Sequence, residues 1–329
     1  MLFANETLYD GDIEKALDVL SGLNIAPIRS QKLRSSQQRL LAQAQIRVED
    51  YDGAIASLTN VIDFPRSDRM SALINRCFAY LRINLVLDAQ RDCAAAKGAI
   101  KSAEIRGKPV SDHRKISFAM VEAEILLRSG RTGAALDTLT AAIGIAQQAR
   151  TLDRHWGLSL FKAQVLTVLG REDEALSIID RITPKVPPSE KHQILAERAA
   201  VFLRKGNIET ALYNWSAASL ASPKNAEEYL FKSCVSLIQA AKYERARAPC
   251  GELVQLDEDN SVFADAYAVS VLESQGVMAA APEVLRALEL RPRSELLMRM
   301  TNEIRNSASN YLKSTNLPPF LWGQNDPAD

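Results

Sequence analysis

The feature that most constrains the fold of this 329-residue chain is a phrase that recurs along it, in which a small or polar turn precedes a helix-forming run with an alanine. Clear copies include GDIEKAL at Gly11 and GNIETAL at Gly206, whereas GVMAAAP at Gly276 is a weak one. The anchoring alanines are Ala16, Ala54, Ala89, Ala135, Ala175, Ala211, Ala246 and Ala281. Their successive separations are 38, 35, 46, 40, 36, 35 and 35 residues. Periods of this length are typical of helical repeats.

Two further positions recur at fixed distances from each anchoring alanine. Twelve residues earlier stands a small side chain, with Val269 as the exception: Ala4, Ala42, Cys77, Ala123, Ala163, Ala199 and Cys234. Four residues later stands a larger group: Leu20, Leu58, Cys93, Leu139, Ile179, Trp215, Cys250 and Leu285. A spacing of four places two side chains on one helical face, so the pattern predicts an apolar stripe on paired helices.

This pattern resembles the tetratricopeptide repeat family, whose 34-residue unit is two antiparallel helices with small residues at positions 8 and 20. The best copy is His192 to Asn225, which is 34 residues long and includes Pro223 where the family has proline. The resemblance covers nearly the whole chain. It implies an all-α, right-handed solenoid, or superhelix, of about eight antiparallel helix pairs with a C-terminal capping helix.

The predicted organisation follows from the phase of the repeats. A polar, basic stretch with Gly107 and Pro109 is either a long loop or extended helix ends, and it could divide the solenoid into two halves. Phe320, Leu321 and Trp322 in the tail either fold back onto the last helices or form a docking motif. The expected segments are a partial N-terminal unit at 1–30, repeats at 35–103, the polar connection at 104–115, repeats at 116–295, a capping helix at 296–314 and a tail at 315–329.

Composition excludes several classes of function. Forty Lys and Arg balance forty Asp and Glu, and aromatic residues are 6%, so no overall charge favours nucleic acid. No run approaches the ~20 apolar residues that span a bilayer, so membrane insertion is not expected. The first residues do not resemble a secretory signal, which favours the cytoplasm, unless an export signal was removed and the protein is periplasmic.

In the resembled family the first helix of each pair lines a concave groove, which is therefore the expected site for a protein or peptide partner. At the groove positions the side chains are mostly apolar, namely Ile74, Phe78, Met120, Leu160, Phe231 and Val235. Near the ends of first helices a basic position recurs as Arg47, Arg82, Arg128 and Arg204, and these guanidiniums could hold carboxylates or carbonyls of a bound peptide. The alternatives are packing between repeats for the apolar residues, and a favourable helix dipole for the arginines.

Some relatives bind acidic chaperone tails with Lys, Asn and Arg from three successive repeats. Arg39, Gln43 and Asn75 imitate the first part of that set. Ser117 and Val121 stand where the third repeat would need Lys and Arg, so the resemblance to this clamp is incomplete.

The cysteines form two pairs at equivalent repeat positions, Cys77 with Cys93 and Cys234 with Cys250. Each pair could approach bonding distance across a helix pair, but buried free thiols are the favoured interpretation. The three histidines lack metal or catalytic spacing, and phosphate-binding loops and nucleophile motifs are absent. We therefore expect no catalytic, cofactor or metal residues and no small-molecule substrate.

These observations predict a non-enzymatic scaffold or adaptor that binds a peptide or helical segment of a partner protein. One alternative is the recruiting or regulatory module of a larger enzyme. Another is an exported assembly factor of a bacterial envelope. RNA binding is disfavoured because no base-reading pattern of basic and aromatic residues stands out.

Overall fold

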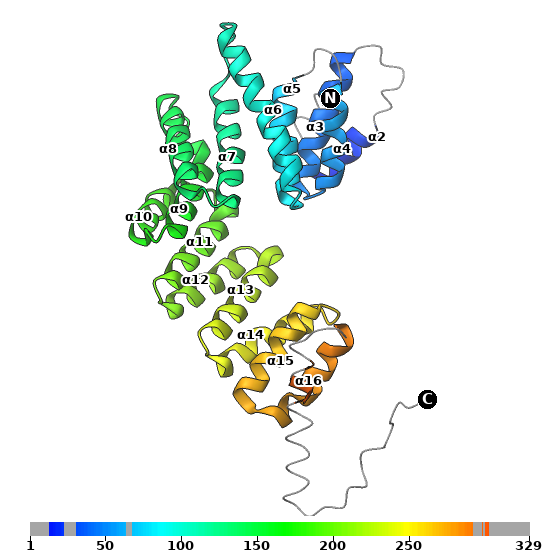
Figure 1. Ribbon diagram of the computed structural model, residues 1–329, viewed down its shortest axis with the longest axis vertical. Coiled ribbons are helices and arrows are strands. Elements are labelled where there is room, and N and C mark those ends of the chain that lie inside the picture. Colours follow the sequence, from blue (N-terminus) through cyan, green and yellow to red (C-terminus); the bar gives the residue numbers. More distant parts are fainter. Residues whose placement is uncertain (1–12, 23–30, 64–67, 292–297, 299, 303–329) are drawn as a thin grey trace, which may run out of the picture. The chain divides into compact units, whose positions relative to one another are not determined.

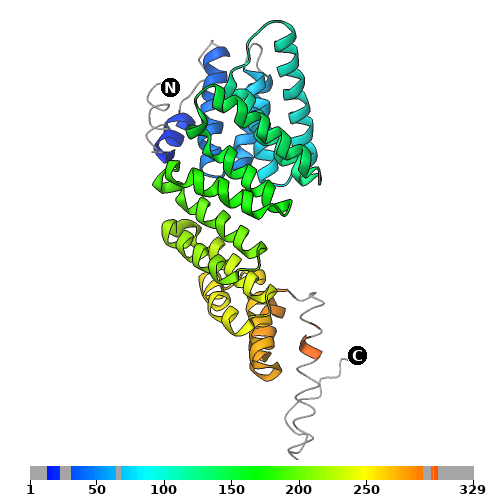
Figure 2. The ribbon, with the colours of Figure 1, turned by 90° about the vertical axis from the view of Figure 1, so that its left-hand side faces the viewer.

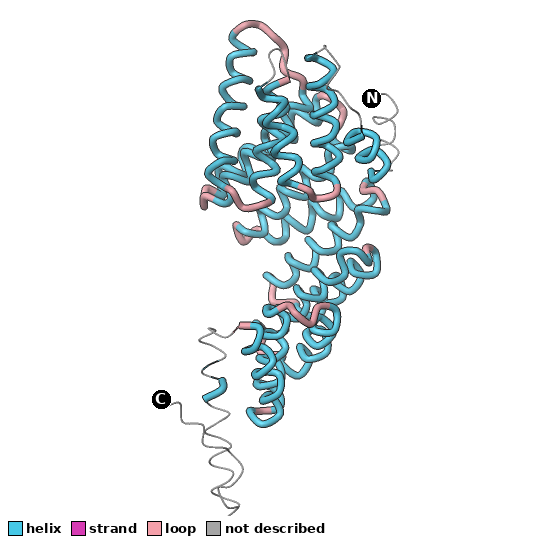
Figure 3. Tube along the Cα trace, turned by 90° about the vertical axis from the view of Figure 1, so that its right-hand side faces the viewer, coloured by secondary structure: helices cyan, strands magenta, loops and turns pink. Residues whose placement is uncertain are grey.

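The computed structural model describes residues 13–22, 31–63, 68–291, 298 and 300–302, and all regular secondary structure within these ranges is helical (Figures 1 and 3). The predicted all-α class is thereby confirmed. The chain divides into two compact units, Met1–Lys185 and Val186–Asp329. Most of the expected capping helix and all of the tail lie outside the described residues, but Met300 is buried against the last helix pair.

The first unit consists of helix α2 followed by four helix pairs with short connections. Each pair is antiparallel, and the second helix of one pair packs against the first helix of the next (Figures 1 and 2). The helices are α2 (Ile13–Gly22), α3 (Gln31–Arg47), α4 (Tyr51–Asp63), α5 (Arg69–Arg82), α6 (Val86–Ile105), α7 (Asp112–Arg128), α8 (Thr132–Gln148), α9 (Trp156–Val168) and α10 (Glu172–Ile182). Two 3₁₀ turns accompany them, η1 (Leu152–His155) and η2 (Thr183–Lys185).

The second unit repeats the same arrangement in three pairs. Its α-helices are α11 (Lys191–Arg204), α12 (Ile208–Ala221), α13 (Ala226–Gln239), α14 (Tyr243–Leu256), α15 (Ser261–Gln275) and α16 (Val277–Leu290). The 3₁₀ turns η3 (Pro188–Glu190) and η4 (Pro223–Asn225) each precede the first helix of a pair. Proline tends to begin such turns because its ring fixes φ and its missing N–H is not needed there.

The division between the units lies after Lys185 and not in the polar stretch 104–115. That stretch is largely extended helix ends, because α6 runs to Ile105 and α7 begins at Asp112. Val110 between them is buried, so the connection is packed against its unit. Prolines at 184, 187 and 188 interrupt the helical hydrogen bonding where the first unit ends.

The anchoring alanine is the fourth residue of the second helix in every described pair, and it is fully buried there. A methyl group at this position lets the two helices of a pair approach closely, while the larger residue four positions later packs one turn further along. In the last pair the anchor is Ala280, not Ala281. Ala268, twelve residues earlier, is also fully buried, so the exception at Val269 disappears.

The last repeat is one residue shorter than the repeat before it. Ala268 and Ala280 follow Cys234 and Ala246 by 34 residues, whereas Cys234 and Ala246 follow Ala199 and Ala211 by 35. Both helices of the last pair are therefore shifted by one residue relative to the sequence pattern. As a result Leu285, expected in the apolar stripe, is 52% exposed, and Val284 is buried instead.

Candidate partner-binding site

A cavity of about 260 Å³ lies across the first helices of three successive pairs in the first unit. We call it the first-helix cavity. Because α3, α5 and α7 are successive first helices, side chains one turn apart on each meet at a common surface. The cavity is lined by Arg39 and Gln43 of α3, by Asp68, Ser71, Ile74 and Asn75 of α5 and its N-cap, and by Ser111, His113, Arg114 and Ser117 of α7 and its N-cap.

One side of the cavity is held by an ion pair between Arg114 and Asp68. Asp68 caps α5 by accepting hydrogen bonds from the backbone N–H of Ser71 at 3.4 Å and from its hydroxyl at 2.9 Å. The Nε of Arg114 donates to the Ser71 hydroxyl at 3.0 Å. These contacts join α7 to the beginning of α5, so Arg114 and Asp68 hold the wall of the cavity together.

The opposite side presents polar groups that the protein leaves unpaired. Within the described part of the chain, Arg39, Gln43, Asn75 and Ser117 make no hydrogen bond or ion pair, although all four line the cavity. Two amides, a guanidinium and a hydroxyl supply donors and acceptors in a shallow polar recess. Such a set suits the backbone and polar side chains of a peptide.

The predicted row of arginines is partly used within the fold. Arg82 pairs with Glu124 at 2.6 Å and lies over the Phe78 ring at 4.8 Å. Arg128 pairs with the same Glu124 at 2.8 Å and donates to the Leu81 carbonyl at 2.9 Å. Arg128 therefore binds a carbonyl in the last turn of α5 from the first helix of the next pair. This contact gives Arg128 a structural role, as the alternative to ligand binding supposes.

The other two arginines of the row do not lie at the first-helix cavity. Arg47 and Arg204 are exposed in the last turns of α3 and α11, in different units. Arg47 therefore belongs to the same unit as Arg82 and Arg128, and Arg204 belongs to the other.

The predicted apolar positions are largely packing residues. Ile74 lines the first-helix cavity but is only 3% exposed and belongs to the core of α5, α6 and α7, and Leu160 is 6% exposed. Met120 packs against the core of α7, α8 and α9. Phe231 packs against Phe263 of α15 with ring centroids 5.6 Å apart, and Val235 is half-buried on the same helix as Phe231.

The clamp resemblance names Arg39, Gln43 and Asn75, with Ser117 and Val121 as its incomplete third element, and it leaves out His113 and Arg114 of α7. In the structure Ser117 joins the cavity and Val121 is buried in the core. His113 and Arg114 enter from the first turn of α7, where the repeat alignment gave no reason to look.

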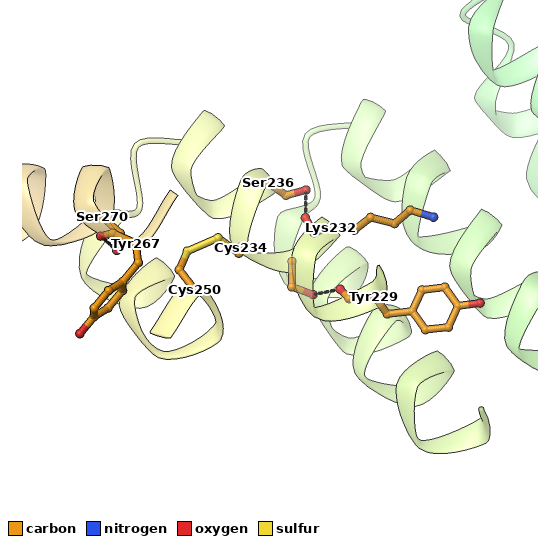
Figure 4. The surroundings of a disulfide bond; sticks show 8 residues. Tyr229, Lys232, Cys234, Ser236, Cys250, Tyr267 and Ser270 are labelled. Atoms are coloured by element: carbon orange, nitrogen blue, oxygen red, sulfur yellow. Dashed lines mark hydrogen bonds between the residues drawn. A yellow bond between two sulfur atoms is a disulfide. The ribbon is translucent and has the colours of Figure 1, made fainter. Parts of the chain in front are cut away.

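The second unit contains a disulfide between Cys234 of α13 and Cys250 of α14, whose Cα atoms are 5.2 Å apart. Figure 4 shows it between the two helices, with Ser236 donating to the Lys232 carbonyl and Ser270 donating to the Tyr267 carbonyl nearby. Cys77 and Cys93, at the equivalent positions of α5 and α6, are buried and free. Free thiols were the favoured expectation for both pairs, and that expectation is wrong for Cys234 and Cys250.

The described residues contain neither a candidate metal site nor a candidate membrane-spanning helix. No group of three or more His, Cys, Asp or Glu side chains in this part of the chain is arranged to hold a metal ion. None of the described helices combines the length and the apolar character that crossing a bilayer requires.

Comparisons with known proteins agree with this architecture. Neither a protein-family model nor a characterised protein sequence matches the chain. Among solved structures, one chain of the APC/C hetero-tetramer Cut9–Hcn1 is similar with a TM-score of 0.59 and 15% identity, over 89% of this chain and 52% of that one. This protein therefore spans about half the length of that relative.

A second similar structure is a tetratricopeptide repeat protein from Parabacteroides merdae. It has a TM-score of 0.51 and 13% identity, over 82% of this chain and 97% of that one. At these identities the likeness concerns the fold, and it agrees with the buried alanines and paired helices described above. The chain has the fold of the tetratricopeptide repeat superfamily, an all-α arrangement of stacked helix pairs.

Proposed function

We propose that this chain is a non-catalytic scaffold that binds an extended segment of a partner protein across α3, α5 and α7. The observation that carries the proposal is the first-helix cavity, where Arg39, Gln43, Asn75 and Ser117 leave their polar groups unpaired. Stacked helix pairs offer shape and local anchors more readily than reactive groups. The likeness to a chain of a hetero-tetrameric assembly is compatible with this role.

The occupant we propose is extended and polar, because the open groups of the cavity are polar and its apolar lining residue, Ile74, is 3% exposed. An amphipathic helix with several apolar anchors fits less well, because Leu160, Met120 and Phe78 are engaged in packing or stacking. Polar side chains on three helices instead suit the alternating backbone groups of an extended segment.

The test is quantitative affinity capture with a matched pair of variants. Gln43→Ala with Asn75→Ala removes two open amides from the cavity without touching the Asp68–Arg114 ion pair. Lys101→Ala with Gln148→Ala changes two exposed side chains on the second helices α6 and α8 and serves as the control. We expect a partner that the wild type and the control retain equally and that the cavity variant loses at least tenfold. Equal retention by the cavity variant would contradict the proposal.

The Cys234–Cys250 disulfide supports a second candidate, a scaffold that works in an oxidising compartment such as the bacterial envelope. Disulfides persist in such compartments and are rare where thiols are kept reduced. Protein isolated from its source in the presence of an alkylating reagent, then unfolded and weighed by mass spectrometry, should carry two alkylated cysteines. Four would place the native protein in a reducing compartment.

A further inference from the structure

A second, larger cavity of about 510 Å³ lies among α8, α9, α10 and the 3₁₀ turns η1 and η2. We call it the α8–α10 cavity. It shares no lining residue with the first-helix cavity. Its volume falls within the range of roughly 300–1,000 Å³ that is usual for ligand sites.

Gly144 helps to keep this cavity open. It lies in the middle of α8, where glycine costs about 0.5–1 kcal/mol relative to alanine. A Cβ added at Gly144 would meet no atom within 4 Å, so the space beside it is empty and not filled by a neighbouring side chain. A side chain at this position would project into the cavity that Gly144 lines.

The walls combine apolar surface with hydrogen-bond donors. Ile143, Leu152 and the Trp156 ring supply the apolar part. Ser159 is buried, and within the described part of the chain its hydroxyl has no hydrogen-bond partner. The Trp156 indole N–H is likewise unpaired there, so two donors of the lining are available to a ligand.

The charge of the lining has one sign. Lys162, Arg181 and Lys185 line the cavity, and no carboxylate is among the described side chains that do so. Within the same residues Arg181 forms no ion pair, so its five N–H donors are available. Lys162 on α9 likewise forms no ion pair within these residues, so the lining offers two cations for two separate carboxylates.

We propose that the α8–α10 cavity binds an acidic peptide segment of a partner protein, with one aromatic or aliphatic side chain seated beside Trp156 and flanking carboxylates on Arg181 and Lys162. The apolar walls account for the central side chain, and the cations account for its neighbours. A fatty acid offers the same chemistry with a single carboxylate, which leaves the second cation unmatched. This site is separate from the one under the proposed function and does not depend on it.

The test uses defined probes and the indole N–H signals of the protein in ¹H–¹⁵N NMR spectra. The acidic probe is the blocked hexapeptide Glu-Asp-Phe-Leu-Asp-Glu, and the matched neutral probe is Gln-Asn-Phe-Leu-Asn-Gln. Trp156→Phe assigns the Trp156 signal, and buried Trp215 provides an internal reference. We expect the acidic peptide to shift the Trp156 signal in a saturable manner and to bind at least tenfold more tightly than the neutral peptide.

A pair of glycine variants on one helix provides the control. Gly144→Leu should fill the cavity and weaken binding of the acidic peptide at least tenfold while the melting temperature stays the same or rises. Gly133→Leu adds the same side chain in the first turn of α8, also in open space but away from the cavity, and should bind as the wild type does. Arg181→Gln should weaken binding severalfold and reduce its dependence on salt.

Three outcomes would overturn the proposal. One is a Trp156 signal that neither peptide moves, and another is equal affinity for the acidic and the neutral peptide. The third is saturable binding of dodecanoate with no binding of the acidic peptide, which would make the site one for lipids. Gln43→Ala with Asn75→Ala leaves this cavity unchanged. A negative result for that variant in partner capture would therefore contradict the proposed function and leave the test of the α8–α10 cavity unaffected.

Discussion

Cys234 and Cys250 stand at the same two repeat positions as Cys77 and Cys93, but only the former pair is joined, across α13 and α14. The position is therefore one where the helices of a pair come close enough for a disulfide. Contact with Cys93, together with burial, raises the pKa of the Cys77 thiol, so it stays protonated at neutral pH. Thiol chemistry at Cys77 should accordingly be slow in the native protein.

Replacing the joined pair should weaken the second unit. A link across 16 residues restricts the unfolded chain, so Cys234→Ser with Cys250→Ser should lower the free energy of unfolding by about 3 kcal/mol. Urea denaturation followed by circular dichroism measures this. Cys77→Ser with Cys93→Ser is the matched control, and a reducing agent should shift its midpoint as it shifts that of the wild type. A midpoint of the wild type that a reducing agent leaves unchanged would show that the disulfide contributes nothing.

The connections within helix pairs offer a second test. Gly206 and Ala241 occupy equivalent left-handed positions after α11 and α13, with φ of 76° and 54°. Glycine adopts this conformation readily, whereas a residue with a Cβ is strained there by about 1 kcal/mol. Gly206→Ala should therefore destabilise the protein by about 1 kcal/mol, although its new Cβ would meet no atom.

The reverse change should have the opposite sign. Ala241→Gly relieves the same strain. It should therefore raise the free energy of unfolding by up to about 1 kcal/mol, and the denaturation midpoint should rise with it. Both variants are measured by urea denaturation on the same day and in the same buffer. Changes of the same sign in the two variants would contradict the conformational explanation.

A third prediction concerns the ion pair between Arg76 of α5 and Asp92 of α6. The Nε and a terminal nitrogen of Arg76 donate to the two Asp92 oxygens at 2.6 and 2.8 Å, and Arg76 also donates to Thr59 at 2.8 Å. Asp92→Ala leaves a largely buried guanidinium without its carboxylate, so it should cost about 3 kcal/mol of unfolding free energy.

Two comparisons separate this pair from an ordinary surface contact. Arg76→Met combined with Asp92→Leu removes both charges and should destabilise less than Asp92→Ala does. Glu174→Ala breaks the exposed Arg171–Glu174 pair and should leave the denaturation midpoint nearly unchanged. Equal losses for Asp92→Ala and Glu174→Ala in denaturant titrations would refute the distinction.

A fourth prediction concerns pH. Burial lowers the pKa of His192, whose Nδ1 lies 2.6 Å from the Tyr229 hydroxyl. Below the ordinary pKa of about 6.5 the unfolded chain binds a proton at this residue that the folded chain binds less readily. The stability of the second unit should therefore fall as the pH drops below 6.5, and stop falling once the folded pKa is passed.

His192→Gln removes this contribution and keeps a hydrogen-bonding side chain near Tyr229. The free energy of unfolding, measured at pH 7.5 and at pH 5.5, should fall more for the wild type than for His192→Gln. His113→Gln, at the first-helix cavity, serves as a control for replacing a histidine in the other unit. A pH dependence unchanged by His192→Gln would assign the effect to other groups.

The spacing of small residues was sufficient to predict the helix pairs. An alanine at the fourth position of each second helix and a small residue twelve positions earlier are what close helix packing requires, and both are readable without coordinates. The prediction was wrong by one residue at the last pair, where Ala268 and Ala280 follow Cys234 and Ala246 by 34 residues and not by 35. Small residues stand at 279, 280 and 281, so the pattern alone does not show which of them is buried.

The assignment of side chains to packing or to binding came only from the tertiary structure. The sequence left a ligand contact and a structural role open for Arg128, and the structure shows that it donates to the Leu81 carbonyl at the end of a helix one pair earlier. Arg39 is on α3, one repeat before α5, and Ser117 is on α7, one repeat after it. The two residues line one cavity because consecutive first helices lie side by side.

The helix pairs could be predicted from the sequence, because helical periodicity and the small residues that close packing requires recur in it at a nearly fixed interval. The tertiary structure decided which pair of cysteines is joined, which arginines are already paired, and where space such as that beside Gly144 is left open. These properties depend on distances between side chains far apart in the sequence, and no spacing along a single chain encodes those distances.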